Sequence, residues 1–277
     1  MGHEQDPQQQ ALDTSVLSEA EANADDVALS PGVTADDPGG IEPYISEEIR
    51  QLYDVYSYRH AAALLATEFP DELKDIERAL LRFRITKTDI GMPGGNESEI
   101  PKKISTTLRP AGWVEARIRG DLVVRMQEHS ESFTADGKAQ KTKRPEVEPK
   151  TIENFIDGHK IDYVKGRVAF DLEWNSKDQT FDRDLYAMRA FHECGLVSAG
   201  IMLTRSEKLD PVFREVPQLD RAGNTVKSSV KSKYGASTTW MGKLLYRLNA
   251  GRNGGCPVLV FGITPRLIHD WNEHEQD

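Results

Sequence analysis

Apolar residues recur at helical spacing in the first part of the chain that carries a sustained hydrophobic pattern. The spacing predicts one helix over residues 46–65, a second over residues 73–83 and a third that opens at Asn96 and ends before Pro110. The buried stripe of the third helix is formed by Ile100, Ile104 and Leu108. These segments predict an N-terminal helical part that packs on the rest of the protein.

Later in the chain the period of the pattern changes to two, which is typical of strands. Strands are predicted over residues 113–118 and 122–132, then a β-hairpin over residues 161–175, and after a helix a buried strand over residues 196–204. Strand, helix and strand in this order form a crossover whose two strands run parallel. A further helix and a final strand complete an α/β fold, in which a mixed β-sheet is flanked by helices.

The second strand of the hairpin has one acidic and one apolar face. Alternation places Asp171, Glu173 and Asn175 opposite to the apolar set, which is Val168, Phe170, Leu172 and Trp174. Asp162 on the first strand is expected opposite Glu173 across the hairpin, so that two or three carboxylates surround a space of the size of a divalent ion. An ordinary edge hairpin with a solvated acidic face explains the same pattern.

The metal interpretation leads to a definite chemistry. Carboxylate and carbonyl oxygens are hard ligands that suit Mg²⁺, with Mn²⁺ as a substitute. Asp162 and Glu173 are the candidate ligands, and the backbone carbonyl of Trp174 is a third. An ion held in this way polarises a phosphoryl oxygen and helps to generate hydroxide from bound water, as in metal-dependent phosphodiesterases.

The net charge of −10 does not exclude a nucleic-acid partner, because the acidity is concentrated at one end. Residues 1–49 hold twelve acidic residues and no Lys or Arg, which leaves the remainder at +2. The composition of residues 1–43 predicts a disordered acidic tail, which either solvates the protein or shields a basic cleft. Residues 44–268 form the folded domain, and residues 269–277 form a short polar tail.

Two polar segments interrupt the folded domain. Residues 136–150 are expected to form a flexible basic loop that can contact DNA phosphates through Lys141, Lys143 and Arg144. A solvated surface insertion fits this segment equally well. Residues 206–235 form a longer polar insertion. The chain has no apolar run of membrane-spanning length and no secretory signal, so a cytoplasmic location is expected.

The segment from Asp162 to Asn175 resembles the active-site motif of the PD-(D/E)xK nucleases. Glu173, Trp174 and Asn175 resemble the variant of this motif in the BglII/BstYI group of type II restriction endonucleases, where a polar amide replaces the usual Lys. The order of elements over residues 50–265 is similar to the core of that group. The resemblance implies a restriction-endonuclease-like fold.

The resemblance also implies roles by position. Asp162 and Glu173 would bind Mg²⁺, and Asn175 would orient the attacking water. Glu115 falls near the position that helps to arrange this water. The spacing from Asp162 to Glu173 is slightly longer than in the named enzymes, so Asp171 is expected either to share the ligand role of Asp162 or to take it over.

For DNA recognition, the resemblance points to loops and helix starts. The candidates are Ser176, Lys177, Asp178, Ser237, Thr238 and Thr239, although Ser and Thr at a helix start are more often plain N-caps. The implied activity is cleavage of double-stranded DNA at a short palindromic site by a homodimer, with a DNA methyltransferase acting separately. Two other functions stay open: a catalytically inactive, sequence-specific DNA-binding protein of the same fold, and a nuclease for branched or damaged DNA.

Overall fold

The computed structural model of the chain describes residues 40–94 and 99–271. By the density of their internal contacts, the residues divide into two compact units. We call the unit made of Met1–Glu115 and Ile161–Asp277 the body, and the unit Ala116–Lys160 the ribbon.

Parts of three predictions lie outside the described residues. They concern the acidic tail 1–43, the helix start at Asn96 and the polar tail 269–277, of which residues 40–43 and 269–271 alone are described. Ile41 is buried in the core of the body. The folded part therefore begins a few residues before the predicted boundary at residue 44.

A six-stranded mixed sheet runs through the body. In spatial order its strands are β1 (Tyr53–Tyr58), β12 (Val258–Ile263), β9 (Ala199–Arg205), β8 (Val168–Glu173), β7 (Lys160–Lys165) and β2 (Val114–Arg117). Strands β12, β9 and β8 are parallel, whereas β1 pairs antiparallel with β12 and β7 pairs antiparallel with β8. The predicted crossover is confirmed, because α7 (Thr180–Glu193) connects the parallel strands β8 and β9.

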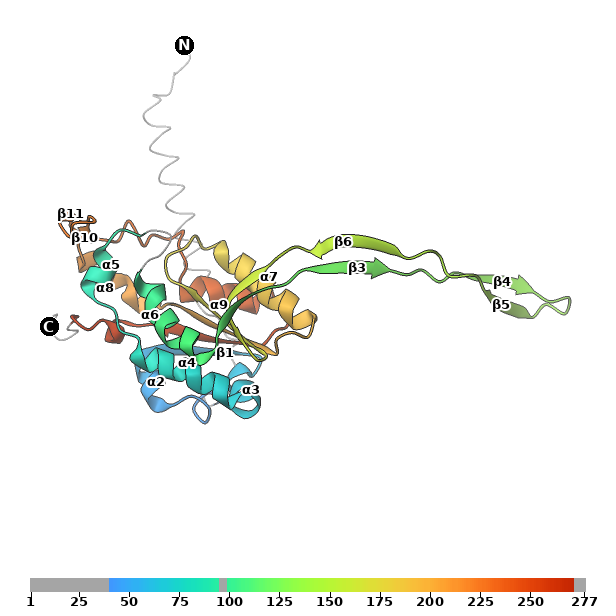
Figure 1. Cartoon of the computed structure of the whole chain (residues 1–277), viewed down its shortest axis with the longest axis horizontal. Coiled ribbons are helices and arrows are strands. Elements are labelled where there is room, and N and C mark those ends of the chain that lie inside the picture. The colour runs from blue at the N-terminus through green and yellow to red at the C-terminus, as the bar shows by residue number, and fades with distance from the viewer. Residues whose placement is uncertain (1–39, 95–98, 272–277) are drawn as a thin grey trace, which may run out of the picture. The chain divides into compact units, whose positions relative to one another are not determined.

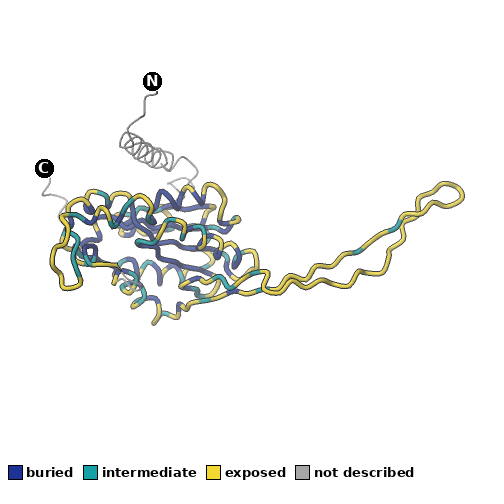
Figure 2. The backbone as a smooth tube through the Cα atoms, turned by 90° about the horizontal axis from the view of Figure 1, so that it is seen from above, coloured by how far each residue is buried: buried dark blue, intermediate teal, exposed yellow. Residues whose placement is uncertain are grey.

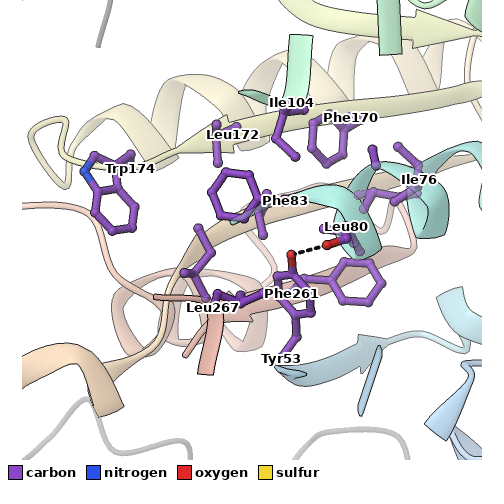
Figure 3. Close-up of a cluster of buried hydrophobic side chains, with 14 of the residues drawn as sticks. Tyr53, Ile76, Leu80, Phe83, Ile104, Phe170, Leu172, Trp174, Phe261 and Leu267 are labelled. Carbon is purple, nitrogen blue, oxygen red and sulfur yellow. Dashed lines mark hydrogen bonds between the residues drawn. The ribbon is translucent and has the colours of Figure 1, made fainter. Parts of the chain in front are cut away.

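One face of the sheet is covered by helices from the N-terminal part. They are α2 (Glu47–Leu52), α3 (Ala61–Glu68), α4 (Pro70–Arg82) and α6 (Glu99–Leu108). Their apolar residues share one core with Phe170 and Leu172 of β8, and Phe83 lies within it (Figure 3). Trp113 is fully buried and contacts Phe170 edge to face, which ties the end of the helical part to the central strand.

The other face of the sheet is covered by α7 and α9 (Met241–Asn249), which pack on each other (Figure 1). Gly200 on β9 lets α7 approach the sheet closely, since a Cβ atom at this position would collide with the sulfur of Met188.

Within the described part of the chain, no helix is both long and apolar enough to cross a membrane. The body also contains the short helix α5 (Lys87–Gly91) and the 3₁₀ turns η2 (Arg109–Ala111), η3 (Glu207–Leu209) and η4 (Pro265–Leu267).

The helix predicted over residues 46–65 is wrong. The structure has the short helix α2, then strand β1, then α3. The β1 segment is rich in aromatic residues, which favour strands, and it pairs antiparallel with β12 along its whole length. Pairing with a distant strand therefore outweighs the helical spacing of Val55, Tyr58 and Ala62. The second and third predicted helices are confirmed as α4 and α6.

Residues 206–235, which were expected to form a polar insertion, are partly folded into the body. They contain α8 (Asp210–Glu215) and a small hairpin of β10 (Gln218–Leu219) and β11 (Thr225–Lys227). Six of their side chains lie in the main core, namely Leu209, Val212, Phe213, Val216, Val230 and Tyr234. The β10–β11 hairpin is thus the polar part of this segment, and the residues before and after the hairpin contribute to the core.

The ribbon is a two-stranded antiparallel structure. Strand β3 (Gly120–Val124) pairs with β6 (Lys150–Ile156), and β4 (His129–Phe133) pairs with β5 (Ala139–Lys143) (Figure 1). The predicted loop over residues 136–150 is therefore wrong, because it contains β5. The strand predicted over residues 122–132 corresponds to β3 and β4. Strands β5 and β6 were not predicted, since they pair through their backbones and bury almost no side chains (Figure 2).

The fold leads to a first prediction, at the contact between β1 and α4. The buried hydroxyl of Tyr53 donates to the carbonyl of Leu80 at 2.8 Å (Figure 3). Replacement Tyr53→Phe removes this hydrogen bond and is expected to lower the free energy of unfolding by about 1 kcal/mol in urea titrations. Tyr246→Phe is the control, because this ring is 47% exposed. Equal effects of the two substitutions would contradict a structural role of the Tyr53 hydroxyl.

Candidate active site

Strand β8 turns its acidic residues away from the main core. Phe170 and Leu172 pack in that core, so the alternation of the strand directs Asp171 and Glu173 to the opposite face, which α7 covers. Both acidic residues are buried there, with exposed fractions of 5% and 9%. Since β8 is buried on both faces, the alternative of an edge hairpin with a solvated acidic face is wrong.

The register of the hairpin differs from the expected one. Tyr163 pairs with Phe170, so Asp162 lies opposite Asp171 rather than opposite Glu173. The backbone N–H of Asp162 donates to Oδ1 of Asp171 at 3.1 Å. The structure therefore joins Asp162 directly to Asp171, and Glu173 follows two residues later on the same face of β8.

A further acidic residue of the cluster, Asp184, was not predicted from the sequence. It lies on α7 with only 3% of its surface exposed, and its charge acts on both Asp171 and Glu173. Nε and Nη2 of Arg183 donate to Oδ1 of Asp184 at 3.0 and 2.9 Å, and the same Nη2 lies 3.7 Å from Oε1 of Glu173. A signal existed, because Asp184 occupies a position of the helical stripe that is otherwise apolar: Phe181, Leu185 and Met188.

The acidic cluster resists ionisation. Burial and the charge of Asp184 raise the pKa of Glu173 to about 8. Burial, together with the charges of Asp184 and Asp162, raises the pKa of Asp171 well above its usual range. Burial also raises the pKa of Asp184, although Arg183 acts against this. Oδ2 of Asp184 is buried and has no hydrogen-bond donor among the described residues.

A cleft of about 630 Å³ opens beside the end of β8. Asp162, Glu173 and Asn175 line it together, as the sequence analysis expected. Nδ2 of Asn175 donates to the carbonyl of Lys233 at 3.3 Å, whereas its buried Oδ1 has no partner within the described part of the chain. The amide is thus held through its nitrogen, and its oxygen is a buried acceptor without a donor among the described residues.

Lys233 is a cation that the sequence analysis did not select for this cleft. Its Nζ donates to the carbonyl of Ile90 at 3.0 Å and to that of Met92, so it also holds the end of α5. Burial lowers the pKa of Lys233 to about 8. The position of Lys233 in the cleft could not be predicted from the sequence, because it depends on how residues 206–235 pack on the rest of the body.

Two segments that were expected to contact DNA lie side by side. The N–H of Asp178 donates to the carbonyl of Ser237 at 3.1 Å, and the N–H of Thr239 donates to that of Ser176 at 2.9 Å. The buried side chain of Arg205 reinforces the junction, because its Nε donates to the carbonyl of Thr239 at 2.9 Å. The segment after β8 and the segment before α9 are therefore joined by hydrogen bonds into one surface.

The candidates on this surface differ in accessibility. Lys177 and Ser237 are exposed, and Ser176 and Thr238 are half-buried. Thr239 is fully buried, so the base contact proposed for it is wrong. Asp178 lies 3.1 Å from Nζ of Lys243, which gives it a role in holding α9. The N-cap interpretation also fails, because the N-cap of α9 is Trp240 and no side chain caps the helix.

Four further candidates belong to β2 and to the ribbon. Glu115 is exposed on β2 and does not line the described part of the cleft. Lys141, Lys143 and Arg144 are exposed in the ribbon, on β5 and directly after it. Arg144 lies 3.5 Å from Glu128, so part of the basic charge of this segment is neutralised by the neighbouring strand.

The donors in the cleft fit a hard divalent cation. Among residues 40–94 and 99–271, no three His, Cys, Asp or Glu side chains are placed to hold a metal ion by themselves. Mg²⁺ does not require three, because it usually keeps several waters and binds through one or two carboxylates and the phosphates of its substrate. The carboxyl groups of the acidic cluster are oxygen donors of the kind that such a cation prefers.

The sheet order, the flanking helices and the acidic cleft at the end of the central strand define a restriction-endonuclease-like α/β protein. The model of one family, described as restriction endonuclease BglII/BglIII, matches residues 53–263. This range is most of the chain, and the chain belongs to that family of restriction endonucleases. The family resemblance is thereby confirmed. A comparison with curated individual proteins gave no match.

The electrostatics of the cleft lead to a prediction for the metal-free protein. The pKa of Glu173 is about 8 in the fold, above the usual value of 4.5. The stabilisation from protonated Glu173 is therefore complete below about pH 4.5 and is lost as the pH rises through about 8. In EDTA, Tm is expected to fall between pH 5.5 and 8.5 more steeply for the wild type than for Glu173→Gln. Equal slopes in thermal scans would contradict the raised pKa.

Proposed function

We propose that the protein is a Mg²⁺-dependent type II restriction endonuclease that hydrolyses phosphodiester bonds of double-stranded DNA at a short palindromic site. The observation that carries this proposal is the acidic cluster of β7, β8 and α7, which meets a cleft at the end of β8. Membership of the restriction endonuclease family supports the reaction class. The burial of acidic side chains, which costs stability, is expected where their charge serves a ligand.

Asp162, Asp171 and Glu173 are the residues that would hold Mg²⁺, with the backbone carbonyl of Trp174 as a further ligand and Mn²⁺ as a substitute. Asp171 joins the proposed set because it lies opposite Asp162 in the hairpin. When bound, Mg²⁺ supplies polarisation of the phosphoryl oxygen and helps to form hydroxide from water. Binding requires ionised carboxylates, so it releases protons from the cluster.

The other residues of the cleft would position the reacting groups. Oδ1 of Asn175 can accept a hydrogen bond from the attacking water, while its Nδ2 is held by the carbonyl of Lys233. Ser176 hydrogen-bonds to the carboxyl of Glu173 and keeps it in place. Arg183 lies near Glu173 and Asp184 and compensates part of the negative charge that an incoming phosphate meets.

The surface formed by Ser176, Lys177 and Ser237 is the proposed DNA contact nearest to the cleft. Exposed Lys177 can reach a phosphate or a guanine edge, and the rigid backbone pairing with residues 237–239 fixes its position. A palindromic site requires a two-fold arrangement of two copies, so we propose a homodimer in the cytoplasm. A separate DNA methyltransferase would protect host DNA.

Incubation of the purified protein with plasmid DNA tests this function. With Mg²⁺ we expect discrete fragments whose ends map to one short sequence, and EDTA should abolish cleavage. A smear, or cutting limited to branched or damaged DNA, would replace the proposed substrate. Tight binding to one sequence without cleavage in either Mg²⁺ or Mn²⁺ would instead identify an inactive DNA-binding protein.

Substitutions in the cluster form a second test. Asp171→Asn and Glu173→Gln each remove a charge from the proposed ligand set and should lower the single-turnover cleavage rate by about a hundredfold or more. DNA affinity without a metal should stay within a few fold of the wild type. Glu193→Gln serves as the matched control, because this residue lies at the exposed end of α7. Unchanged cleavage by both cluster variants would exclude the proposed ligand set.

A further inference from the structure

The ribbon carries an apolar surface that it does not bury. All of its residues are described, and Ile118 alone among them is buried. Large apolar side chains are exposed on and near β3 and β6, including Val123 at 48%, Val124 at 44% and Phe155 at 58%. Figure 2 shows the same exposure along both strands. A two-stranded structure without a core is marginally stable in water, so the ribbon needs a partner surface.

The charge of β3 and β6 disfavours DNA as that partner. The two strands together hold Asp121, Glu153 and Lys150, a net charge of −1. The whole ribbon holds nine basic and eight acidic residues, so it is almost neutral. Binding to a phosphate backbone draws its affinity from an excess of positive charge, which these strands lack. An apolar surface with balanced charges is typical of a protein contact.

The geometry of β3 and β6 suits a second copy of the same segment. They form a sheet of two strands, so each strand has one edge without a strand partner. Such an edge is a template for pairing with another strand. Two identical segments related by a two-fold axis present the same residues to each other, and their nearly balanced charges avoid strong repulsion.

We propose that the β3–β6 half of the ribbon is the surface through which two copies of this chain pair. The proposal rests on the homodimer of the proposed function and assigns its contact. On the face that carries Leu122, the apolar residues of the two strands that would be covered are Leu122, Val124 and Ile152. Pairing through apolar side chains holds without DNA and depends little on salt.

The β4–β5 half of the ribbon provides a control within the same unit. It is mainly polar, and its acidic residues lie beside its basic ones, as in the pairs Asp136 with Lys138 at 3.3 Å and Glu128 with Arg144 at 3.5 Å. Phe133 is the exception, with 70% of its surface exposed. A substitution there changes an exposed apolar residue of the ribbon but leaves the proposed pairing surface intact.

Sedimentation velocity of the full chain without DNA or metal tests the proposal. The double variant Leu122→Glu with Ile152→Glu places two charges on neighbouring residues of one face, since these residues pair across the strands. We expect the wild type and the control Phe133→Glu to sediment as dimers and the double variant as a monomer of 31.1 kDa. Tm of the body should be the same in all three proteins.

A wild-type monomer at micromolar concentration, or a double variant that remains dimeric, would overturn the proposal. Loss of DNA binding by the double variant together with a monomeric wild type would make DNA the partner instead.

If the double variant is unfolded, Leu122→Thr with Ile152→Thr replaces it, because Thr favours strands. This milder variant should weaken the dimer at least tenfold, and an unchanged dissociation constant would again overturn the proposal. A double variant that remains dimeric would overturn the pairing surface alone, whereas a wild-type monomer would also remove the DNA-free homodimer from the proposed function. Neither result bears on the nuclease reaction, which plasmid cleavage tests separately.

Discussion

The burial of β8 on both faces is the constraint on which the rest of the structure depends. Its apolar face completes the core with the N-terminal helices, and this contact fixes the strand in the centre of the sheet. The same alternation then places Asp171 and Glu173 under α7, where most of their surface is removed from water. The alternation of β8 therefore has two consequences: one set of its residues stabilises the core, and the other set places carboxyl groups with raised pKa values near the cleft.

Segments with a strong period could be predicted from the sequence. The β7–β8 hairpin, the crossover through α7 and the last helix and strand each have residues whose burial repeats at their own spacing. Strand β1 could not be predicted, because its partner β12 lies about 200 residues away and only that pairing selects strand over helix. Strand β5 pairs without burying side chains, so it leaves no hydrophobic pattern.

The candidate site shows a similar division. The sequence identified Asp162, Glu173 and Asn175, which do line one cleft, because hairpin alternation determines the face of each residue. The predicted register of the hairpin was wrong, because Asp162 lies opposite Asp171 and not opposite Glu173. The length of the turn sets this register, and the sequence does not determine it reliably. Asp184 and Lys233 arrive from other elements, and only the packing of α7 and of residues 206–235 brings them to the site.

Anomalous diffraction from crystals soaked in Mn²⁺ would test most directly whether the acidic cluster of β7 and β8 is the metal centre. Mn²⁺ shares the oxygen ligands of Mg²⁺ and scatters strongly enough to be located. The account predicts a peak in the cleft within bonding distance of carboxylate oxygens of Asp162 and Asp171 or Glu173. A peak bound elsewhere on the chain, with none at these carboxylates, would contradict it.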